Sequence, residues 1–349
     1  MSEKHIGLTE KTHSDKFDAK FEFINKDLFH VLCGPADGRV RELSEFLGVD
    51  LIPRGNLFHI KSESREKRDA SLNFFNKISE LYPENSKNFP EAFDLQYIFS
   101  EVNKSADISE KLIEKKSEDE SGLDLLREKI FTTARGRPIY PRTIRQAEYI
   151  DSLKKNAITI CKGPAGTGKT FLGIAQACSL FMQGEVERLI LTRPAVEAGE
   201  SLGFLPGDLS QKVDPYLRPV YDALYDCIGM EKVHDLISSR KIEIAPLAYM
   251  RGRTLNDAFI ILDEAQNCTL PQLKMFLTRL GKNSRMCLGG DVTQVDLGPG
   301  RSGLEKSIEI LSGLKGVGIV SFSRKDIVRN PIVEKILEAF DAVEDVGKL

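Results

Sequence analysis

The sequence contains no tryptophan, only five histidines, and six cysteines that never form a C-x-x-C pair. The histidines and cysteines show none of the spacings that bind structural zinc. Scattered cysteines without an apolar secretory leader predict reduced thiols in a cytoplasmic protein. No apolar run approaches the roughly 18 residues of a membrane-spanning helix. These absences argue against a zinc module, a disulfide-rich secreted domain and any contact with a membrane.

An excess of charge of one sign is also lacking. The 349 residues include 49 Lys and Arg against 52 Asp and Glu, which gives a net charge of −3. A protein that attracts nucleic acid through its overall field would be strongly basic. Any contact with RNA would therefore need a local basic patch. The length and the 41% hydrophobic content predict a globular chain of two or three domains.

The strongest motif present is a glycine-rich run that fits the pattern G-x-x-x-x-G-K-[ST]. Its residues are Gly163, Pro164, Ala165, Gly166, Thr167, Gly168, Lys169 and Thr170. Such a loop points successive backbone N–H groups at one anion, and the phosphates gain from the positive end of the following helix. Lys169 adds a charge for the β- and γ-phosphates, and the Thr170 hydroxyl can ligate Mg²⁺. The run predicts that ATP and Mg²⁺ bind here.

Two acids follow an apolar strand, 258–262, further along the chain. An acid at the carboxyl end of such a strand is typical of the second half of a nucleotide hydrolase site. Asp263 is predicted to hold Mg²⁺, and Glu264 to orient and deprotonate the attacking water. The alternative is a pair of surface acids after a core strand. A Glu directly after the Asp favours hydrolysis over a kinase or a slow switch.

Two glutamines are further candidates. Gln294 follows a third strand and can report whether the γ-phosphate is present. Gln146 lies 17 residues before Gly163 and can pair with N6 and N7 of adenine. The alternative for Gln146 is an exposed helix position, and for Gln294 an ordinary loop residue.

Several arginines have no obvious structural task. Arg253 and Arg329 are the candidates for an arginine finger that stabilises transition-state charge, and Arg193, Arg251 and Arg324 are further possibilities. Others can bind RNA phosphates, and a solvated surface arginine is the alternative for each.

The pattern along the chain predicts four segments: a disordered tail over 1–16, a small α+β domain over 17–83, a charged helical or flexible linker over 84–134, and an ATPase domain over 135–349. In the small domain we expect a strand over 28–33, a turn over 34–38, helices over 40–47 and 70–81, and a hairpin of 49–53 with 57–60.

In the larger domain, strands alternate with helices. This alternation predicts an α/β fold with a parallel sheet covered by helices on both faces. The expected strands are 157–161, 189–192, 242–245, 258–262, 286–288 and 317–321. The expected helices are 170–182, 271–280, 303–314 and 331–340.

Longer runs around these motifs resemble the bacterial PhoH-like family. The resemblance covers about residues 135–345 and is carried by the segments 192–200, 203–208, 249–267 and 274–281. Within the family the chain is most similar to the YbeZ-type members, which carry an extra N-terminal domain. Residue 330 is Asn where many relatives have His, which excludes a pH-linked role at that position.

The resemblance implies a RecA-like P-loop ATPase core, similar to superfamily 1 helicases, and a hexameric ring. It also implies a role in ribosomal RNA maturation with a YbeY-type endoribonuclease. It places the 286–288 strand between the glycine-loop strand and the Asp263 strand. Because residues 135–349 suffice for only one core, a neighbouring subunit would complete the site. One function is an RNA-stimulated or helicase-like ATPase. The alternative is a nucleotide-gated adaptor that docks an endoribonuclease on ribosomal particles.

The N-terminal residues 21–82 resemble a KH-like domain more weakly. A KH domain that binds RNA clamps it with a G-x-x-G loop. The run from Gly34 to Gly38 is one residue longer than that loop, and Asp37 would oppose a phosphate. Docking or assembly is therefore as good an interpretation of this domain as RNA binding.

Overall fold

The computed structural model describes residues 17–84, 125–126, 128–194, 209–298, 300–328 and 336, the side chains of 209–216 excepted. The chain divides into two compact units, Met1–Asp124 and Leu125–Leu349. The second unit begins ten residues before the predicted boundary at 135. The reason is that Ile130 lies in its core and that β4 (Phe131–Thr132) pairs with β5 (Pro138–Ile139).

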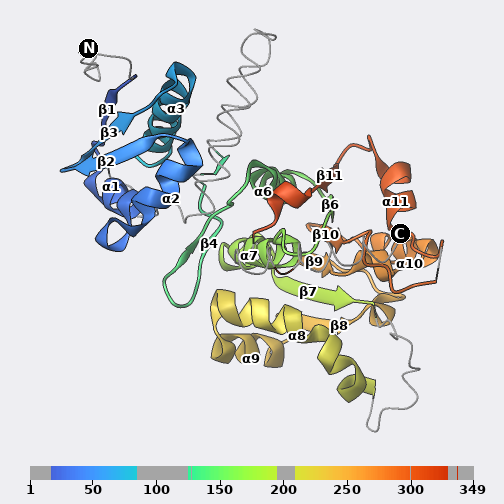
Figure 1. Cartoon of the computed structure of the whole chain (residues 1–349). Coiled ribbons are helices and arrows are strands. Elements are labelled where there is room, and N and C mark those ends of the chain that lie inside the picture. Colours follow the sequence, from blue (N-terminus) through green and yellow to red (C-terminus); the bar gives the residue numbers. More distant parts are fainter. Residues whose placement is uncertain are drawn as a thin grey trace. The chain divides into compact units, whose positions relative to one another are not determined.

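The first unit packs helices against a three-stranded antiparallel sheet with the order β1-β3-β2 (Figure 1). Its elements are β1 (Ala19–Glu22), α1 (Lys26–Cys33), the short 3-10 helix η1 (Pro35–Asp37), α2 (Gly38–Leu47), β2 (Asp50–Arg54), β3 (Leu57–Lys61) and α3 (Arg65–Leu81). The predicted hairpin and the helices 40–47 and 70–81 are confirmed. Strand β1 was not predicted. The KH-like assignment stays a prediction.

The segment 28–33, predicted as a strand, is the helix α1. Asn25 begins this helix, because its side-chain Oδ1 accepts a hydrogen bond from the Leu28 backbone N–H at 3.0 Å. Asparagine is a favoured residue at this capping position. The helix ends at Gly34, whose N–H donates to the His30 carbonyl. A short run of apolar residues fits a strand buried on both faces and a buried helix equally well. The Asn25 cap is the local feature that favours the helix.

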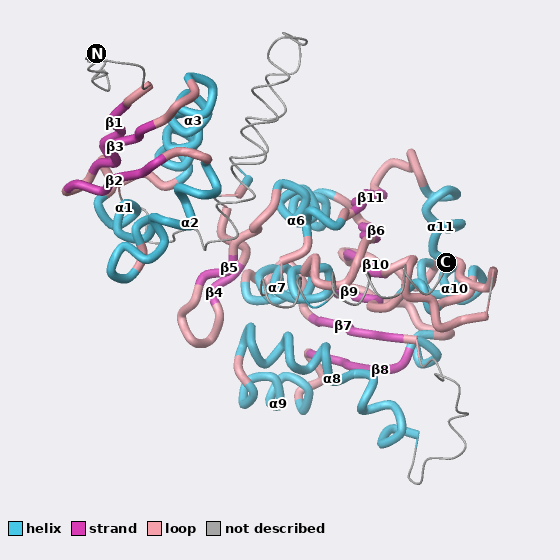
Figure 2. The backbone as a smooth tube through the Cα atoms, viewed as in Figure 1, coloured by secondary structure: helices cyan, strands magenta, loops and turns pink. Residues whose placement is uncertain are grey.

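The second unit is built on a six-stranded sheet with the order β11-β6-β10-β9-β7-β8 (Figure 2). Every neighbouring pair in it is parallel. Its strands are β6 (Ile158–Lys162), β7 (Arg188–Arg193), β8 (Ile242–Pro246), β9 (Ala258–Leu262), β10 (Arg285–Gly290) and β11 (Val317–Ser321). All six were predicted to within two residues. The position of β10 between β6 and β9 confirms the expected strand order.

Helices cover both faces of this sheet. One apolar cluster contains residues of α6 (Ile144–Lys155), α7 (Lys169–Met182), α8 (Leu209–Ile228) and α9 (Met230–Ser238). The other contains residues of α10 (Leu270–Leu277), α11 (Leu304–Leu311) and the 3-10 helix η3 (Leu247–Met250). Because both faces are covered, all five residues of β9 are buried. The α/β fold with a parallel sheet is therefore confirmed.

The remaining differences from the sequence analysis are local. Helices α6, α8 and α9 were not among the expected helices, and the expected helix 331–340 lies outside the described residues apart from residue 336. All six cysteines are buried free thiols. No helix of the described residues is both long and apolar enough to span a bilayer.

Candidate nucleotide-binding site

The glycine-rich loop joins the end of β6 to the start of α7, as the motif requires. Gly163 has φ +151°, and a Cβ built there would lie only 2.5 Å from the Phe322 Cβ. Gly168, which precedes the first helical residue, is left-handed with φ +82°. Only glycine suits both positions, because one has no space for a side chain and the other has a strained backbone. The loop is therefore shaped by its neighbours as well as by its own sequence.

Lys169 lies inside the curve of this loop. Its Nζ donates hydrogen bonds to the carbonyls of Gly163 at 2.7 Å and Pro164 at 2.8 Å. Thr167 closes the same turn, because its Oγ1 donates to the Pro164 carbonyl at 2.9 Å. The ammonium is thus held against the loop backbone, next to the orphan N–H groups of the α7 N-terminus. Positive charge and free N–H donors together make a site for phosphate oxygens.

Gln146, in α6, is not an exposed helix residue, so that alternative is wrong. Its side chain is 3% exposed. Its Oε1 accepts from the Arg142 backbone N–H at 2.7 Å, and its Nε2 donates to the Thr167 carbonyl at 3.1 Å. Both amide atoms are therefore engaged in holding the loop. Recognition of adenine by Gln146 stays a prediction, and it requires these two bonds to be exchanged.

Thr170 and Asp263 meet directly. The Thr170 hydroxyl donates to Asp263 Oδ1 at 2.7 Å, although the residues are 93 positions apart. Asp263 is 5% exposed. Burial raises the pKa of its carboxyl above the ordinary value, while the nearby Arg193 guanidinium and the Thr170 hydrogen bond oppose that rise. A buried carboxylate next to a hydroxyl is an oxygen donor set that suits Mg²⁺.

Thr170 and Asp263 can be sufficient protein ligands for Mg²⁺ without a larger cluster of acidic residues. The described residues contain no group of three or more His, Cys, Asp or Glu that could hold a metal. Mg²⁺ usually keeps one or two protein oxygens and takes the rest from water and substrate phosphates. Thr170 and Asp263 fit that mode of binding, in which the nucleotide supplies the missing ligands.

Glu264 has a strained backbone and two bonded carboxylate oxygens. Its φ is +56°, a left-handed value that is uncommon outside glycine. Its Oε1 accepts from Arg193 Nη2 at 2.8 Å, and its Oε2 accepts from Gln266 Nε2 at 2.6 Å. Strain of this kind persists only where the surroundings fix the residue, and it clusters at functional sites. The carboxylate is thereby held beside Asp263 at the carboxyl edge of the sheet.

Gln266 connects this acid to the third motif. Its side chain is fully buried. Besides Glu264, its Nε2 donates to the Gln294 carbonyl at 3.0 Å, and its Oε1 accepts from the Asp291 N–H at 2.9 Å. The Asp291 carboxylate in turn accepts from the Ala165 N–H of the glycine-rich loop at 3.0 Å. A continuous set of hydrogen bonds therefore joins the loop, the acids and the segment after β10.

Gln294 is anchored by its backbone, and its side chain is exposed. The structure thus places it beside the acids, and its role as a sensor of the γ-phosphate stays a prediction. Sequence reasoning gave Gln266 no role. The bond between Gln266 and Asp291 and the bond between Asp291 and Ala165 join residues at least 25 positions apart, and only the fold brings these residues together.

The candidate arginines differ in whether they contact the two acids. Arg193, at the end of β7, contacts both acids, since its Nε also lies 3.4 Å from Asp263 Oδ2. Arg253 forms a two-pronged ion pair with Glu243 of β8, which raises the pKa of its guanidinium. Arg329 lies outside the described residues. Neither Arg253 nor Arg329 is therefore joined to the acids by any contact described, and their role as a finger in a neighbouring subunit stays a prediction.

This fold and this loop define a P-loop α/β nucleotide-binding core. The profile of one family, described as "PhoH-like protein", matches residues 138–341. The chain belongs to this family, as the sequence resemblance predicted.

Relatives with that description come from several bacteria. A PhoH-like protein of Bacillus subtilis is 46% identical over 324 residues, which cover 91% of this chain and 95% of the relative. One of Mycobacterium tuberculosis is 44% identical over 324 residues, covering 92% and 87%. The Escherichia coli protein PhoH is 44% identical over 206 residues, covering 58% of each chain. The UvsW helicase of bacteriophage T4 is similar at a TM-score of 0.33 and 11% identity over 65% of this chain and 78% of the helicase, too low to bear on function.

Proposed function

We propose that the chain is a Mg²⁺-dependent ATP hydrolase. The observation that carries the proposal is the 2.7 Å contact of Thr170 with Asp263, which joins the phosphate loop to the acids and leaves Glu264 beside them. Bound Mg²⁺ would neutralise charge on the β- and γ-phosphates. Lys169 binds these phosphates, and Thr170 and Asp263 hold the metal. Glu264 orients the attacking water and accepts its proton.

The contacts of Glu264 hold its carboxylate in place before ATP binds. A general base needs one carboxylate oxygen within hydrogen-bond reach of water. Both oxygens are bonded here, to Arg193 and to Gln266. Arg193 also carries the positive charge that can move toward the γ-phosphate, because it already lies between the two acids. Release of Glu264 by Arg193 would then accompany the binding of ATP.

The test is phosphate release under saturating ATP and Mg²⁺. Lys169→Ala is expected to abolish turnover, and Glu264→Gln to lower kcat by roughly a thousandfold while nucleotide still binds. Lys315→Ala, at an exposed position outside the site, is the matched control and keeps full activity. Normal turnover in both Lys169→Ala and Glu264→Gln would overturn the assignment.

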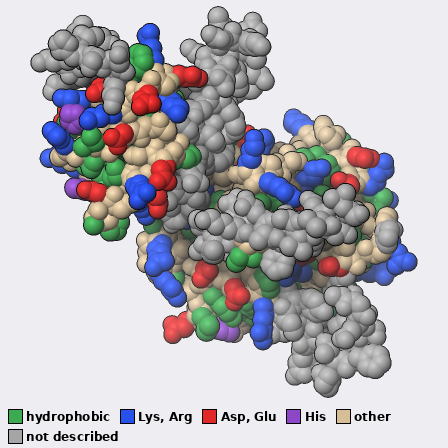
Figure 3. Space-filling model, viewed as in Figure 1, with side chains coloured by type: hydrophobic (Ala, Val, Ile, Leu, Met, Phe, Trp, Pro, Cys, Tyr) green, Lys and Arg blue, Asp and Glu red, His purple; other side chains and the backbone are tan. Residues whose placement is uncertain are grey.

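The target of the ATP cycle is a further proposal. The resemblance to YbeZ-type members implies a role in RNA metabolism, either as an RNA-stimulated, helicase-like ATPase or as an adaptor for a YbeY-type endoribonuclease or a ribosomal particle. The visible surface favours the adaptor, because basic and acidic side chains are interspersed over both described units (Figure 3). Measuring ATPase rate with and without single-stranded RNA across a salt series separates the two, since phosphate contacts weaken steeply with salt. No stimulation at low salt favours the adaptor.

A hexameric ring is also proposed, as the family resemblance implies, and the single core of the second unit is consistent with a site completed by a neighbouring subunit. Sedimentation velocity with and without an ATP analogue tests it. If the arginine finger acts between subunits, mixing Arg329→Ala with Lys169→Ala chains restores part of the activity. The absence of rescue at every mixing ratio would argue against Arg329 as that finger.

A further inference from the structure

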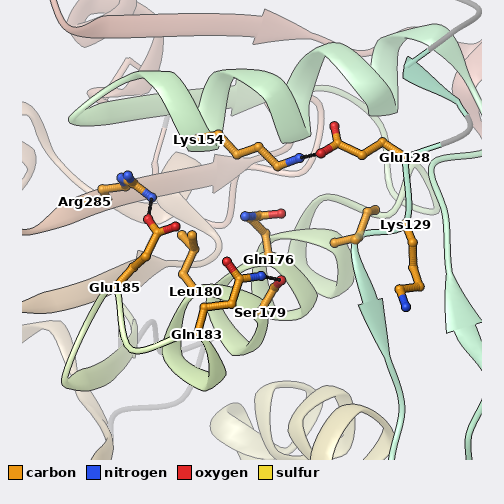
Figure 4. Close-up of a pocket in the computed structure, with 10 residues that line it drawn as sticks. Glu128, Lys129, Lys154, Gln176, Ser179, Leu180, Gln183, Glu185 and Arg285 are labelled. Carbon is orange, nitrogen blue, oxygen red and sulfur yellow. Dashed lines mark hydrogen bonds and ion pairs between the residues drawn. The ribbon is translucent and has the colours of Figure 1, made fainter.

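A polar cavity lies at the edge of the parallel sheet opposite the glycine-rich loop. It has a volume of about 310 Å³. Its walls are the C-terminal part of α6, the second half of α7, residues 128–130 and the first residue of β10 (Figure 4). All of these belong to the second unit. The volume is at the lower end of the range for pockets that bind small molecules.

Gln176 points into this cavity from α7. Its side chain is 2% exposed, and its Oε1 is buried without a hydrogen-bond partner. Figure 4 shows the amide directed into the space between α6 and α7. A buried acceptor that lacks a donor lowers stability, and most such groups in folded proteins are paired. An orphaned amide facing a cavity is therefore evidence of a ligand that supplies the donor.

Charged side chains lie at the ends of the cavity. Arg285 lies at one end, where its Nη1 forms an ion pair with a Glu185 carboxylate oxygen at 3.1 Å (Figure 4). Lys154 pairs with Glu128 at 2.6 Å, and Lys129 lies at the end opposite Arg285 (Figure 4). Three basic and two acidic residues line the cavity, which gives it a net positive charge.

Polar uncharged groups fill the space between these charges. Ser179 of α7 and Gln183, just after the end of α7, lie near Gln176, with Gln183 Nε2 donating to Ser179 Oγ at 3.0 Å. Amides and hydroxyls both donate and accept hydrogen bonds, so they match the hydroxyl groups of a ligand. Guanidinium and ammonium groups match a phosphate or carboxylate.

We propose that this cavity binds a small hydroxylated anion with the size and chemistry of a sugar phosphate. A ligand hydroxyl bonds the Gln176 amide, and the anionic group bonds the Arg285 guanidinium at one end of the cavity. The site is separate from the phosphate loop, since Gln176 follows Lys169 by seven residues along α7. That spacing corresponds to roughly 10 Å of helix. The proposal does not depend on ATP hydrolysis.

Isothermal titration of the full chain carrying Lys169→Ala, with ribose 5-phosphate as the probe, tests the proposal. The Lys169 substitution removes phosphate binding at the loop. We expect binding to persist in this background and to weaken roughly tenfold or more when Gln176→Met is added, because one buried hydrogen bond is lost. Ribose alone and inorganic phosphate alone each satisfy half of the site, so both are expected to bind more weakly than ribose 5-phosphate.

Two further measurements guard against an unfolded variant. Methionine matches the length and helix propensity of glutamine, so Gln176→Met without ligand is expected to unfold at the same or a higher temperature. Lys154→Ala weakens binding, whereas Lys155→Ala, whose side chain is exposed and pairs with Asp151 instead, does not. Equal affinity with and without Gln176→Met, or no binding of any of the three probes, overturns the proposal. A lower unfolding temperature for Gln176→Met also overturns it, because the amide is then already satisfied.

Discussion

The two units differ in what some of their buried polar side chains bond. In the first unit, the buried Asn25, Ser62 and Ser71 bond backbone groups of nearby or neighbouring turns. In the second unit, the buried Asp263 carboxylate instead accepts a hydrogen bond from the Thr170 side chain, 93 positions away, at the carboxyl edge of the sheet. A buried side chain that satisfies backbone serves the fold. One that bonds a second side chain far away in sequence fixes the geometry of a site.

The apolar cores differ correspondingly. The first unit is packed around phenylalanines 21, 23, 58, 74 and 75, whose rings lie within about 6 Å of one another in successive contacts. The second unit packs aliphatic strands between two layers of helices. In the first unit the buried side chains named here stabilise the fold. The second unit also buries charged groups, such as Asp263, and the burial of a charge costs stability.

The largest expected change in unfolding free energy is that of Phe75→Ala in the first unit. Phe75 is fully buried and contacts the rings of Phe21, Phe23, Phe58 and Phe74. Loss of a buried ring costs about 3–5 kcal/mol of unfolding free energy. Urea unfolding should show this loss for the first unit, while steady-state phosphate release is unchanged.

The control for that change is Phe17→Ala, since Phe17 is 40% exposed and should affect unfolding little. A fall in kcat that parallels the loss of stability would contradict the separation of the two units. The units would then have to be treated as one cooperative system.

How much of this could be predicted depends on the distance over which each signal acts. The six strands of the parallel sheet and residues 163–170 are encoded in short apolar or glycine-rich runs, and they were predicted closely. Helix α8 was missed because its sequence contains Pro215 and Pro219, which usually end or kink a helix. Strand β1 is only four residues long, so it gives little periodicity to detect.

The site shows the same division. Thr170, Asp263 and Glu264 were predicted because motifs mark them, and the structure brings them together. The bonds of Arg193 to Glu264 and of Asp291 to the loop join residues 71 and 126 positions apart. No local pattern carries that information, because the strand order decides which loops meet. The cavity at the other edge of the sheet is equally invisible in the sequence.

Substitution of Asp263 tests whether a buried charge of the site lowers the stability of the fold. Burial raises the pKa of Asp263, so the folded state binds a proton more tightly than the unfolded state does. The ionised form is then destabilising at pH values above the raised pKa. Asp263→Asn, without nucleotide or Mg²⁺, is expected to raise the unfolding free energy at neutral pH and to abolish ATP hydrolysis.

This gain should shrink as the pH falls. Below the ordinary pKa of aspartate, about 4, the carboxyl is protonated in both states and the variant loses its advantage. Chemical unfolding of both chains across that pH range provides the measurement. A variant that is less stable than the native chain at neutral pH would show that Arg193 and Thr170 more than offset the burial of the carboxylate.

A smaller effect on nucleotide affinity is expected from Gln146→Ala. This variant tests whether Gln146 acts as a brace, which supports the glycine-rich loop, or recognises the adenine base. Both amide atoms of Gln146 hold backbone, including the Thr167 carbonyl of the loop. As a brace, its loss should weaken ATP and GTP binding alike, by roughly tenfold for a buried hydrogen bond. A change confined to ATP would instead support recognition of adenine. Equilibrium titration of both nucleotides decides between them, with Gln183→Ala, remote from the loop, as control.

The smallest expected effect concerns Asn25, the clearest case of a buried polar group that serves the fold alone. It caps α1 and also donates to the Pro83 carbonyl at 2.8 Å, thereby tying the end of α3 to the start of α1. Asn25→Ala should lower the unfolding free energy by about 1–2 kcal/mol. Asn25→Ser retains the cap and should lose less, and neither variant should alter phosphate release. Equal losses in the two variants would assign the effect to the Pro83 bond rather than to the cap. Altered turnover in either would mean that polar groups of the first unit also act on the site.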